Sequence, residues 1–352
     1  MQLLKILQTA AKYAASDVYI STGEKPGLRI AGKLIFIEDH PVLSKTMAEE
    51  YIFETMSELQ RARFARILDL DYALEIAGLG RFRVNVFMQR KGIAAVFRLI
   101  PEKIQTLDEL NLPSQLKKIV GLKQGIVLVT GPTGSGKSTT LAAIVDEINR
   151  MHSYNVLTVE DPIEFVHQNK KSLIQQREVG EHTKSFGSAL RSALRESMDV
   201  VLVGEMRDHE TISLALTAAE TGHLVLSTLH TSGAAKTIDR VIDVFPSSQQ
   251  EQIRTQLAMS LRAVVWQQLI PRSDGQGRVA ALEILFANNA VQNLIRKGKT
   301  FQLPLIMETG LRDGMQTMQK AILDLQGQGY FDETTAQQYL QALSDQDKEE
   351  SA

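Results

Sequence analysis

The sequence predicts an α/β protein, with a small mixed α+β domain followed by a larger domain built on a mainly parallel sheet. Three observations lead to this prediction. Over residues 1–100, short alternating segments and amphipathic helices follow one another in no regular order. After residue 114, apolar strands alternate with helices, which is typical of a parallel sheet with right-handed crossovers. The length of 352 residues also favours about two domains.

The first domain, expected over residues 1–100, should contain an antiparallel sheet. A helix is predicted over residues 1–15, where leucines and alanines recur at helical spacing. Gly32-Lys33 separates two alternating segments and favours a hairpin between them. The other expected elements are strands at 17–20, 28–31, 34–37 and 72–76, helices at 44–58 and 60–68, and a long hairpin at 80–100.

Residues 101–114 are the expected linker, because they carry two prolines and no clear hydrophobic period. The second domain should cover residues 115–344 and become helical after Val291. A charged tail at 345–352 is expected to be disordered. The strands expected in this domain are 125–129, 155–159, 199–203, 223–227 and 278–285, with helices starting near Lys137, Thr183 and Asp208.

The composition narrows the class of protein. Lys+Arg number 39 and Asp+Glu 41, for a formal net charge of -2, which disfavours a basic nucleic-acid binder. Cysteine is absent, so disulfides and cysteine zinc sites are excluded, as fits a reducing cytoplasm. No apolar run approaches the ~18 residues of a membrane-spanning helix. We therefore expect a cytoplasmic protein that reaches a membrane only through partner proteins.

One glycine-rich segment fits the pattern G-x-x-x-x-G-K-[ST], namely Gly131-Pro132-Thr133-Gly134-Ser135-Gly136-Lys137-Ser138. An apolar strand precedes it and a helical segment beginning with Thr139 follows it, which is the context that gives the pattern meaning. Backbone N–H groups of such a loop and the helix N-terminus cradle phosphates. Lys137 can reach the β- and γ-phosphates, and the Ser138 hydroxyl can bind Mg²⁺. We expect Thr139 to contact the same nucleoside triphosphate.

Acidic residues follow two of the predicted strands. Glu160 and Asp161 come directly after the strand at 155–159, and Glu205 follows the strand at 199–203. Ligands bind beyond the carboxyl ends of parallel strands, so these side chains should lie near the phosphates. We expect Glu160 to activate water and Glu205 to reach Mg²⁺, directly or through water. The alternative for Glu160 and Asp161 is a polar turn ahead of Pro162.

Histidines bracket the strand predicted at 223–227. His230 follows its carboxyl end, where a γ-phosphate sensor would lie, although a single histidine is often structural. His223 begins the strand, at the opposite edge of the sheet, and from the residues alone it is expected to be structural.

Arginines gather on one face of the hairpin at 80–100. Arg81 and Arg83 alternate with apolar residues, and a two-residue turn near Arg90 puts Arg98 on the same face. Like charges across neighbouring strands are destabilising unless an anion compensates them. The arginines could therefore contact nucleotide phosphates, whereas the alternative is a solvated strand face.

Together these motifs resemble the hexameric type II/IV secretion ATPases, and most closely the type IV pilus retraction ATPases (PilT-like). The resemblance covers nearly the whole chain. It rests on the Walker A loop at 131–138, an aspartate box at 158–165, a Walker B segment at 199–208, a histidine box at 221–246, and the segments 173–180 and 290–300.

The resemblance implies a PAS-like N-terminal α+β domain and a RecA-like P-loop ATPase domain in a ring of six subunits. It implies ATP and Mg²⁺ as cofactors, and an inner-membrane pilus platform protein as partner. The implied catalytic residues are Glu160, Glu205, His230 and His223, and the family's N-terminal arginines match Arg81, Arg83 and Arg98. His223 thereby gains a role that its position alone did not suggest.

The sequence also departs from the family pattern. Ser197-Met198 replaces an acidic residue and proline, Ser16-Asp17-Val18-Tyr19 replaces a Ser-Asp-Leu-His pattern, and Val291-Gln292 replaces Ile-Arg. An accessory PilU-like ATPase, which is a possible paralogous partner, and an ATPase of another secretion or DNA-uptake machine therefore stay open. A RecA-like nucleic-acid motor and a nucleotide-binding regulator without turnover are the alternatives of a different class.

Overall fold

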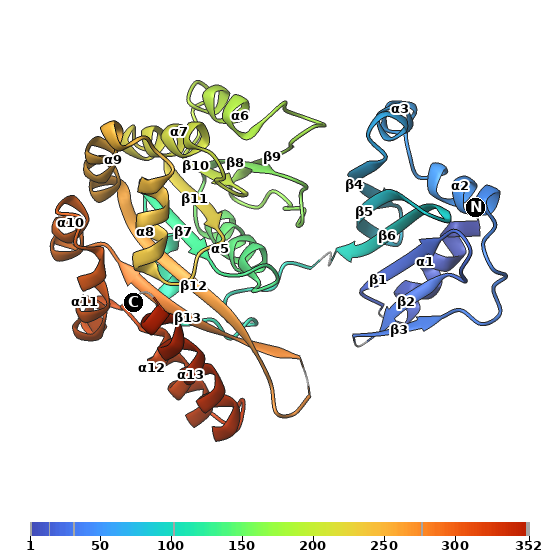
Figure 1. Cartoon of the computed structure of the whole chain (residues 1–352). Helices are drawn as coiled ribbons and strands as arrows, with labels where there is room; N and C mark the ends of the chain where they lie inside the picture. The colour runs from blue at the N-terminus through green and yellow to red at the C-terminus, as the bar shows by residue number, and fades with distance from the viewer. Residues whose placement is uncertain (1, 14, 31, 101–102, 276, 350–352) are drawn as a thin grey trace. The chain divides into compact units, whose positions relative to one another are not determined.

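The computed structural model describes residues 2–13, 15–30, 32–100, 103–275 and 277–349 (Figure 1). The chain forms two compact units. The first comprises the residues up to Lys103 together with Pro162–Val166, and the second comprises Ile104–Asp161 and the chain from His167 onward.

The first unit contains a six-stranded antiparallel sheet with the order β3-β2-β1-β6-β5-β4. The expected α+β architecture of this part is therefore confirmed. Its strands are β1 (Asp17–Ser21), β2 (Gly27–Ile30), β3 (Lys33–Phe36), β4 (Asp69–Ile76), β5 (Gly80–Gln89) and β6 (Gly92–Ile100), and its helices are α1 (Gln2–Lys12), α2 (Lys45–Phe53) and α3 (Glu58–Ile67).

The hairpin of β5 and β6 follows the alternation of its sequence. Phe82, Val84 and Val86 are buried in the core shared with the helices, while the intervening side chains are partly exposed. Gln89 pairs with Gly92, so the connection is the expected two-residue turn.

The second unit is built on a seven-stranded sheet with the order β13-β12-β7-β11-β10-β8-β9. All neighbouring strands are parallel except β12 and β13, which are antiparallel. The expected mainly parallel sheet is thus confirmed. The strands are β7 (Gly125–Thr130), β8 (Asn155–Glu160), β9 (Leu173–Glu178), β10 (Val200–Val203), β11 (Leu224–Leu229), β12 (Leu261–Pro271) and β13 (Arg278–Phe286).

Helices cover both faces of this sheet. Alternate residues of β7 enter two separate cores, because successive side chains of a strand point to opposite faces. Val127 and Val129 pack with α4 (Lys117–Val120) and α5 (Lys137–Met151). Ile126 and Leu128 belong to the core formed with α6 (Phe186–Ala193), α7 (His209–Glu220), α8 (Ala234–Asp243) and α9 (Ser247–Ser260).

Further helices complete the second unit. They are η1 (Ser114–Leu116), α10 (Asn289–Arg296), η2 (Thr300–Gln302), α11 (Leu303–Thr309), η3 (Gly310–Asp313), α12 (Met318–Gly327) and α13 (Glu333–Glu349). The tail expected to be disordered at 345–352 instead continues α13 as far as Glu349, and residues 350–352 lie outside the described residues. No helix in the described part of the chain is long and apolar enough to span a membrane.

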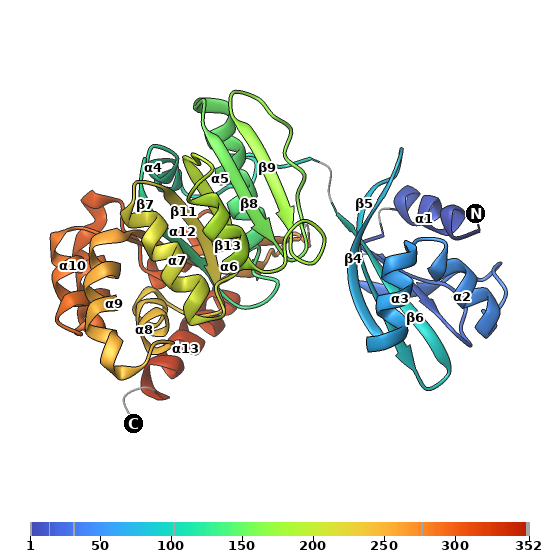
Figure 2. The same ribbon diagram turned by 90° about the horizontal axis from the view of Figure 1, so that it is seen from above.

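Two strands of the second unit were not expected. β9 lies beside β8 at one edge of the sheet (Figure 2), and β12 runs between β7 and β13. The segment expected at 278–285 is present as β13, but it returns antiparallel to β12. The reason is that β12 leaves α9 directly and enters β13 through a hairpin rather than through a helix.

Candidate functional site

The glycine-rich loop connects β7 to α5, as the sequence predicts. Gly131 has a φ of 142° and is buried, and a Cβ there would lie 2.3 Å from the carbonyl oxygen of Gln267. Only glycine fits this close approach of two backbones. The loop therefore folds back against β12 before α5 begins at Lys137.

Lys137 is held within the loop. Its side chain is largely buried, and Nζ donates hydrogen bonds to the carbonyl oxygens of Gly131 at 2.9 Å and Pro132 at 3.0 Å. The Ser135 hydroxyl is buried and has no hydrogen-bond partner among the described residues. A buried hydroxyl without a partner is costly unless a ligand satisfies it. This hydroxyl and the Lys137 ammonium, which both lie near Gly131, are groups that can bind the oxygens of a phosphate.

Glu160 ends β8 at the carboxyl edge of the sheet. Its Oε1 accepts hydrogen bonds from Thr158 Oγ1 at 2.6 Å and from Gln176 Nε2 at 3.3 Å. The neighbouring strand β10 leads into Gly204, where a Cβ would lie 3.3 Å from the Glu160 Cα atom and 3.2 Å from the Val159 carbonyl oxygen. Gly204 thus lets the chain pass close to Glu160.

Glu205 lies in a group of positive charges. Its Oε2 is 2.7 Å from Arg207 Nη2, and its Oε1 is 3.3 Å from His230 Nε2. Burial alone would raise the pKa of Glu205, but the hydrogen bond and charge of Arg207, followed by the charges of His230 and Lys137, hold it below its usual value. Glu205 is therefore ionised at neutral pH and can serve as an oxygen ligand of a divalent cation.

His223 lies at the other edge of the sheet. It precedes β11, its carbonyl oxygen accepts a hydrogen bond from Gly125 at the start of β7, and its Nδ1 lies 3.0 Å from the carbonyl oxygen of Ala218. His230 follows the end of the same strand and contacts Glu205. The structure thus joins His230 to the carboxylate, whereas His223 fixes the turn between α7 and β11.

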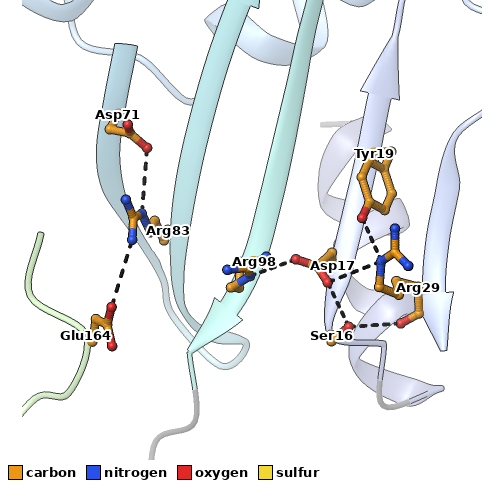
Figure 3. Close-up of polar contacts among 8 residues, drawn as sticks. All are labelled: Ser16, Asp17, Tyr19, Arg29, Asp71, Arg83, Arg98 and Glu164. Carbon is orange, nitrogen blue, oxygen red and sulfur yellow. Dashed lines mark hydrogen bonds and ion pairs between the residues drawn. The ribbon is translucent and has the colours of Figure 1, made fainter. Parts of the chain in front are cut away.

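Two arginines of the predicted group, Arg83 and Arg98, have carboxylate partners within the first unit (Figure 3). Arg98 Nε lies 2.8 Å from Asp17 Oδ1, and Arg83 Nε lies 3.6 Å from Asp71 Oδ1. Arg83 also approaches Glu164, with Nη1 3.9 Å from Oε1. The hypothesis that their proximity requires a bound anion is corrected, because these carboxylates supply the negative charge. A role of Arg81, Arg83 and Arg98 toward a nucleotide stays a prediction.

The sequence did not single out several residues at this edge. Arg207 forms an ion pair with Glu205, and its position two residues after Glu205 in the sequence could have indicated this contact. Thr228 Oγ1 donates to the carbonyl oxygen of Gly204 at 2.6 Å and so fixes the loop that bears Glu205. Gln267 contacts the phosphate loop from a strand that was not expected.

Comparison with known proteins identifies the family. A family model described as type II/IV secretion system protein matches residues 1–336. The chain belongs to this family. It is 50% identical over 327 residues to a twitching motility protein of Neisseria gonorrhoeae, covering 93% of this chain and 87% of that protein. It is 48% identical over 338 residues to the type IV pilus retraction ATPase PilT of Pseudomonas aeruginosa, covering 96% and 98% respectively.

A solved structure leads to the same family. The crystal structure of the pilus retraction motor PilT with bound ADP superposes on this chain with a TM-score of 0.88. The two are 45% identical, and the match covers 95% of each chain. The resemblance to PilT-like ATPases inferred from the motifs is therefore confirmed, as is a RecA-like domain that follows an N-terminal domain.

Proposed function

We propose that this chain is the ATP-hydrolysing motor that drives type IV pilus retraction, and hence twitching motility. The observation that carries the proposal is the proximity of the phosphate loop to Glu205. The Lys137 ammonium of this loop is close enough to help lower the pKa of the Glu205 carboxylate. Identity of 48% to a pilus retraction ATPase, over 98% of that protein, supports the direction of the movement.

The residues at the carboxyl edge of the sheet would each have a separate role in ATP binding and hydrolysis. Gly131, Pro132, Thr133, Gly134, Ser135, Gly136, Lys137, Ser138 and Thr139 would hold the nucleotide. Ser138 and Glu205 are the oxygen donors for Mg²⁺, which neutralises phosphate charge when bound. Glu160 would orient and deprotonate the attacking water, since its carboxylate already accepts two hydrogen bonds that fix its position. His230 would sense phosphate through its contact with Glu205.

The remaining predicted residues act in an assembly. In a homohexamer, Arg81, Arg83 and Arg98 would approach phosphates. Arg83 and Arg98 would exchange their carboxylate partners, Asp71 and Asp17, for phosphate oxygens. His223 would act indirectly, through the turn that sets β11 and therefore His230. We further propose that the ring works in the cytoplasm against an inner-membrane pilus platform protein.

Deletion of the gene, with imaging of surface pili, tests the direction of force. We expect more surface pili and a loss of twitching, both restored by the wild-type gene but not by a Glu160→Gln variant. An absence of pili would instead indicate an assembly motor. Loss of twitching with pili that still retract would indicate the accessory role of a PilU-like paralogue.

Phosphate release by the purified full-length protein tests the enzyme itself. We expect ATP hydrolysis that requires Mg²⁺ and is unchanged by added DNA. Strong stimulation by DNA would favour a nucleic-acid motor, and an absence of turnover in the assembled protein would favour a regulator.

A further inference from the structure

Gln267 is a buried polar residue that the proposed mechanism does not use. It lies on β12, and 2% of its surface is exposed. The preceding residue, Trp266, pairs with Thr130 at the end of β7, which brings this part of β12 beside the start of the phosphate loop. A buried amide needs hydrogen-bond partners for both of its polar atoms.

Both partners belong to the nucleotide-binding segment. Gln267 Nε2 donates to the carbonyl oxygen of Ser135 at 2.7 Å, and Thr140 Oγ1 donates to Gln267 Oε1 at 2.7 Å. A carbonyl oxygen can only accept, so the amide nitrogen must face Ser135. The amide oxygen is then left to accept from Thr140. The direction of this chain of hydrogen bonds is therefore fixed, and it links the loop to the first turn of α5.

The contact with Ser135 orients the peptide that follows it. A trans peptide is planar, with C=O and N–H on opposite sides. When the Ser135 carbonyl is directed at β12, the N–H of Gly136 is directed away from β12. Gly136 has a φ of 87°, and a Cβ there would lie 2.8 Å from Gln267 Nε2. The amide thus packs directly on the glycine that immediately precedes α5.

Gln267 also contacts the other end of the loop. Its own carbonyl oxygen is the atom 2.3 Å from where a Gly131 Cβ would be. One residue of β12 therefore supports Gly131 through its backbone and Ser135, Gly136 and Thr140 through its side chain.

We infer that Gln267 is a positioning residue, which holds the phosphate loop so that its backbone N–H groups face the polyphosphate of the nucleotide. The inference rests on the proposed function, because it requires this loop to bind ATP. Gln267 does not touch the reacting atoms. It acts by keeping the loop and α5 in a fixed relation before the nucleotide arrives, which lowers the cost of ordering them on binding.

Titration of the full-length protein with a fluorescent ADP analogue and Mg²⁺, together with ATPase kinetics, tests the inference. Gln267→Leu removes both hydrogen bonds and leaves the Ser135 carbonyl without its donor, so we expect roughly tenfold weaker nucleotide affinity. KM for ATP should rise more than kcat falls, because the loop binds substrate and transition state alike. Gln268→Leu, the neighbouring change on the opposite face of β12, is the matched control and should leave both values unchanged.

The variant Gln267→Glu should show a pH-dependent nucleotide affinity, which a loss of packing alone would not produce. A protonated carboxyl has one donor and one acceptor, like the amide, whereas an ionised carboxylate faces the Ser135 carbonyl with no donor. Burial favours the protonated form. We therefore expect the affinity of this variant, relative to wild type, to recover as pH falls from about 8 to about 6.

A further variant keeps the inference testable if Gln267→Leu does not fold. Thr140→Val removes the other end of the chain of hydrogen bonds while preserving shape, and should also weaken affinity, with an effect less than additive to that of Gln267→Glu. Wild-type affinity in Gln267→Leu, or no pH-dependent recovery in Gln267→Glu, overturns the inference alone. Failure of the wild-type protein to bind the analogue overturns the proposed function and this inference with it.

Discussion

Arg83 and Arg98 lie directly opposite each other across β5 and β6, and each has a carboxylate partner on the strand beyond. The two partners differ in burial. The Asp17 side chain is 5% exposed, whereas that of Asp71 is 46% exposed. Asp17 also lies 3.8 Å from Arg29 and accepts a hydrogen bond from Ser16 Oγ. Of these two carboxylates, Asp17 should therefore contribute more to the stability of the sheet.

Asp17→Asn should destabilise the first unit by roughly 2 kcal/mol, because it leaves Arg29 and Arg98 without their shared charge. Hydrogen exchange of the full-length protein measures this locally, as faster exchange in β1 and β6 with β7 as internal reference. Asp71→Asn is the control, and as an exposed pair it should cost less than about 1 kcal/mol. Equal effects of the two variants would contradict the assignment.

Glu160→Gln should abolish most hydrolysis while nucleotide binding persists. The amide keeps the shape of the side chain but cannot accept a proton from water, so kcat should fall by at least about a hundredfold. Phosphate release measures kcat, and titration with a fluorescent ADP analogue measures binding. Retention of near wild-type turnover would assign water activation to another residue.

Arg207→Gln should shift the pH dependence of hydrolysis. Burial raises the pKa of Glu205, and Arg207 is the largest influence that lowers it. Without Arg207 the pKa rises, so the acidic limb of the kcat/KM profile should move to higher pH. Because the pKa of Glu205 is depressed in the folded protein, its contribution to stability is present above the ordinary carboxyl pKa and is lost as pH falls through the folded value. Arg195→Gln is the control, because it removes an arginine that does not influence the pKa of Glu205. An unshifted pH profile in Arg207→Gln would show that Arg207 does not set the pKa of Glu205.

Gly204→Ala should lower kcat through Glu160. The added methyl would meet the Val159 carbonyl oxygen at 3.2 Å and the Glu160 Cα atom at 3.3 Å, so these atoms must move by a few tenths of an ångström. If Glu160 activates water as proposed, a displacement of that size should cost roughly tenfold in kcat with little change in KM. Ala substitution at Gly327, which has no positive φ and whose added Cβ would meet no atom within 4 Å, would show the effect of an added methyl without displacement.

Local patterns predicted much of this protein. The alternation of strands and helices, the loop at 131–138 and the acids after β8 and β10 all depend on residues close together in sequence. The location of Arg98 on the same face as Arg83 was also predicted, because a two-residue turn limits the register of a hairpin, and the structure shows that the two lie directly opposite each other. These features needed no knowledge of the rest of the chain.

Other features depend on contacts between distant segments. Gln267 lies 132 residues from Ser135 and 127 from Thr140, so no local pattern joins them. β12 was missed because two glutamines interrupt its apolar run and because it follows α9 without a loop. The compensation of Arg98 by Asp17 spans 81 residues and could not be read from the hairpin itself.

The direct passage from α9 into β12 has a mechanical consequence. Gln267 and the end of α9 are separated by about 20 Å of extended chain, at about 3.3 Å per residue, and an extended strand bonded on both sides stretches very little. α9 in turn packs against α10, most of which belongs to the segment 290–300 that contributes to the family resemblance. A displacement at the phosphate loop would therefore be transmitted along β12 to α9 and the C-terminal helices with little change in the length of the strand.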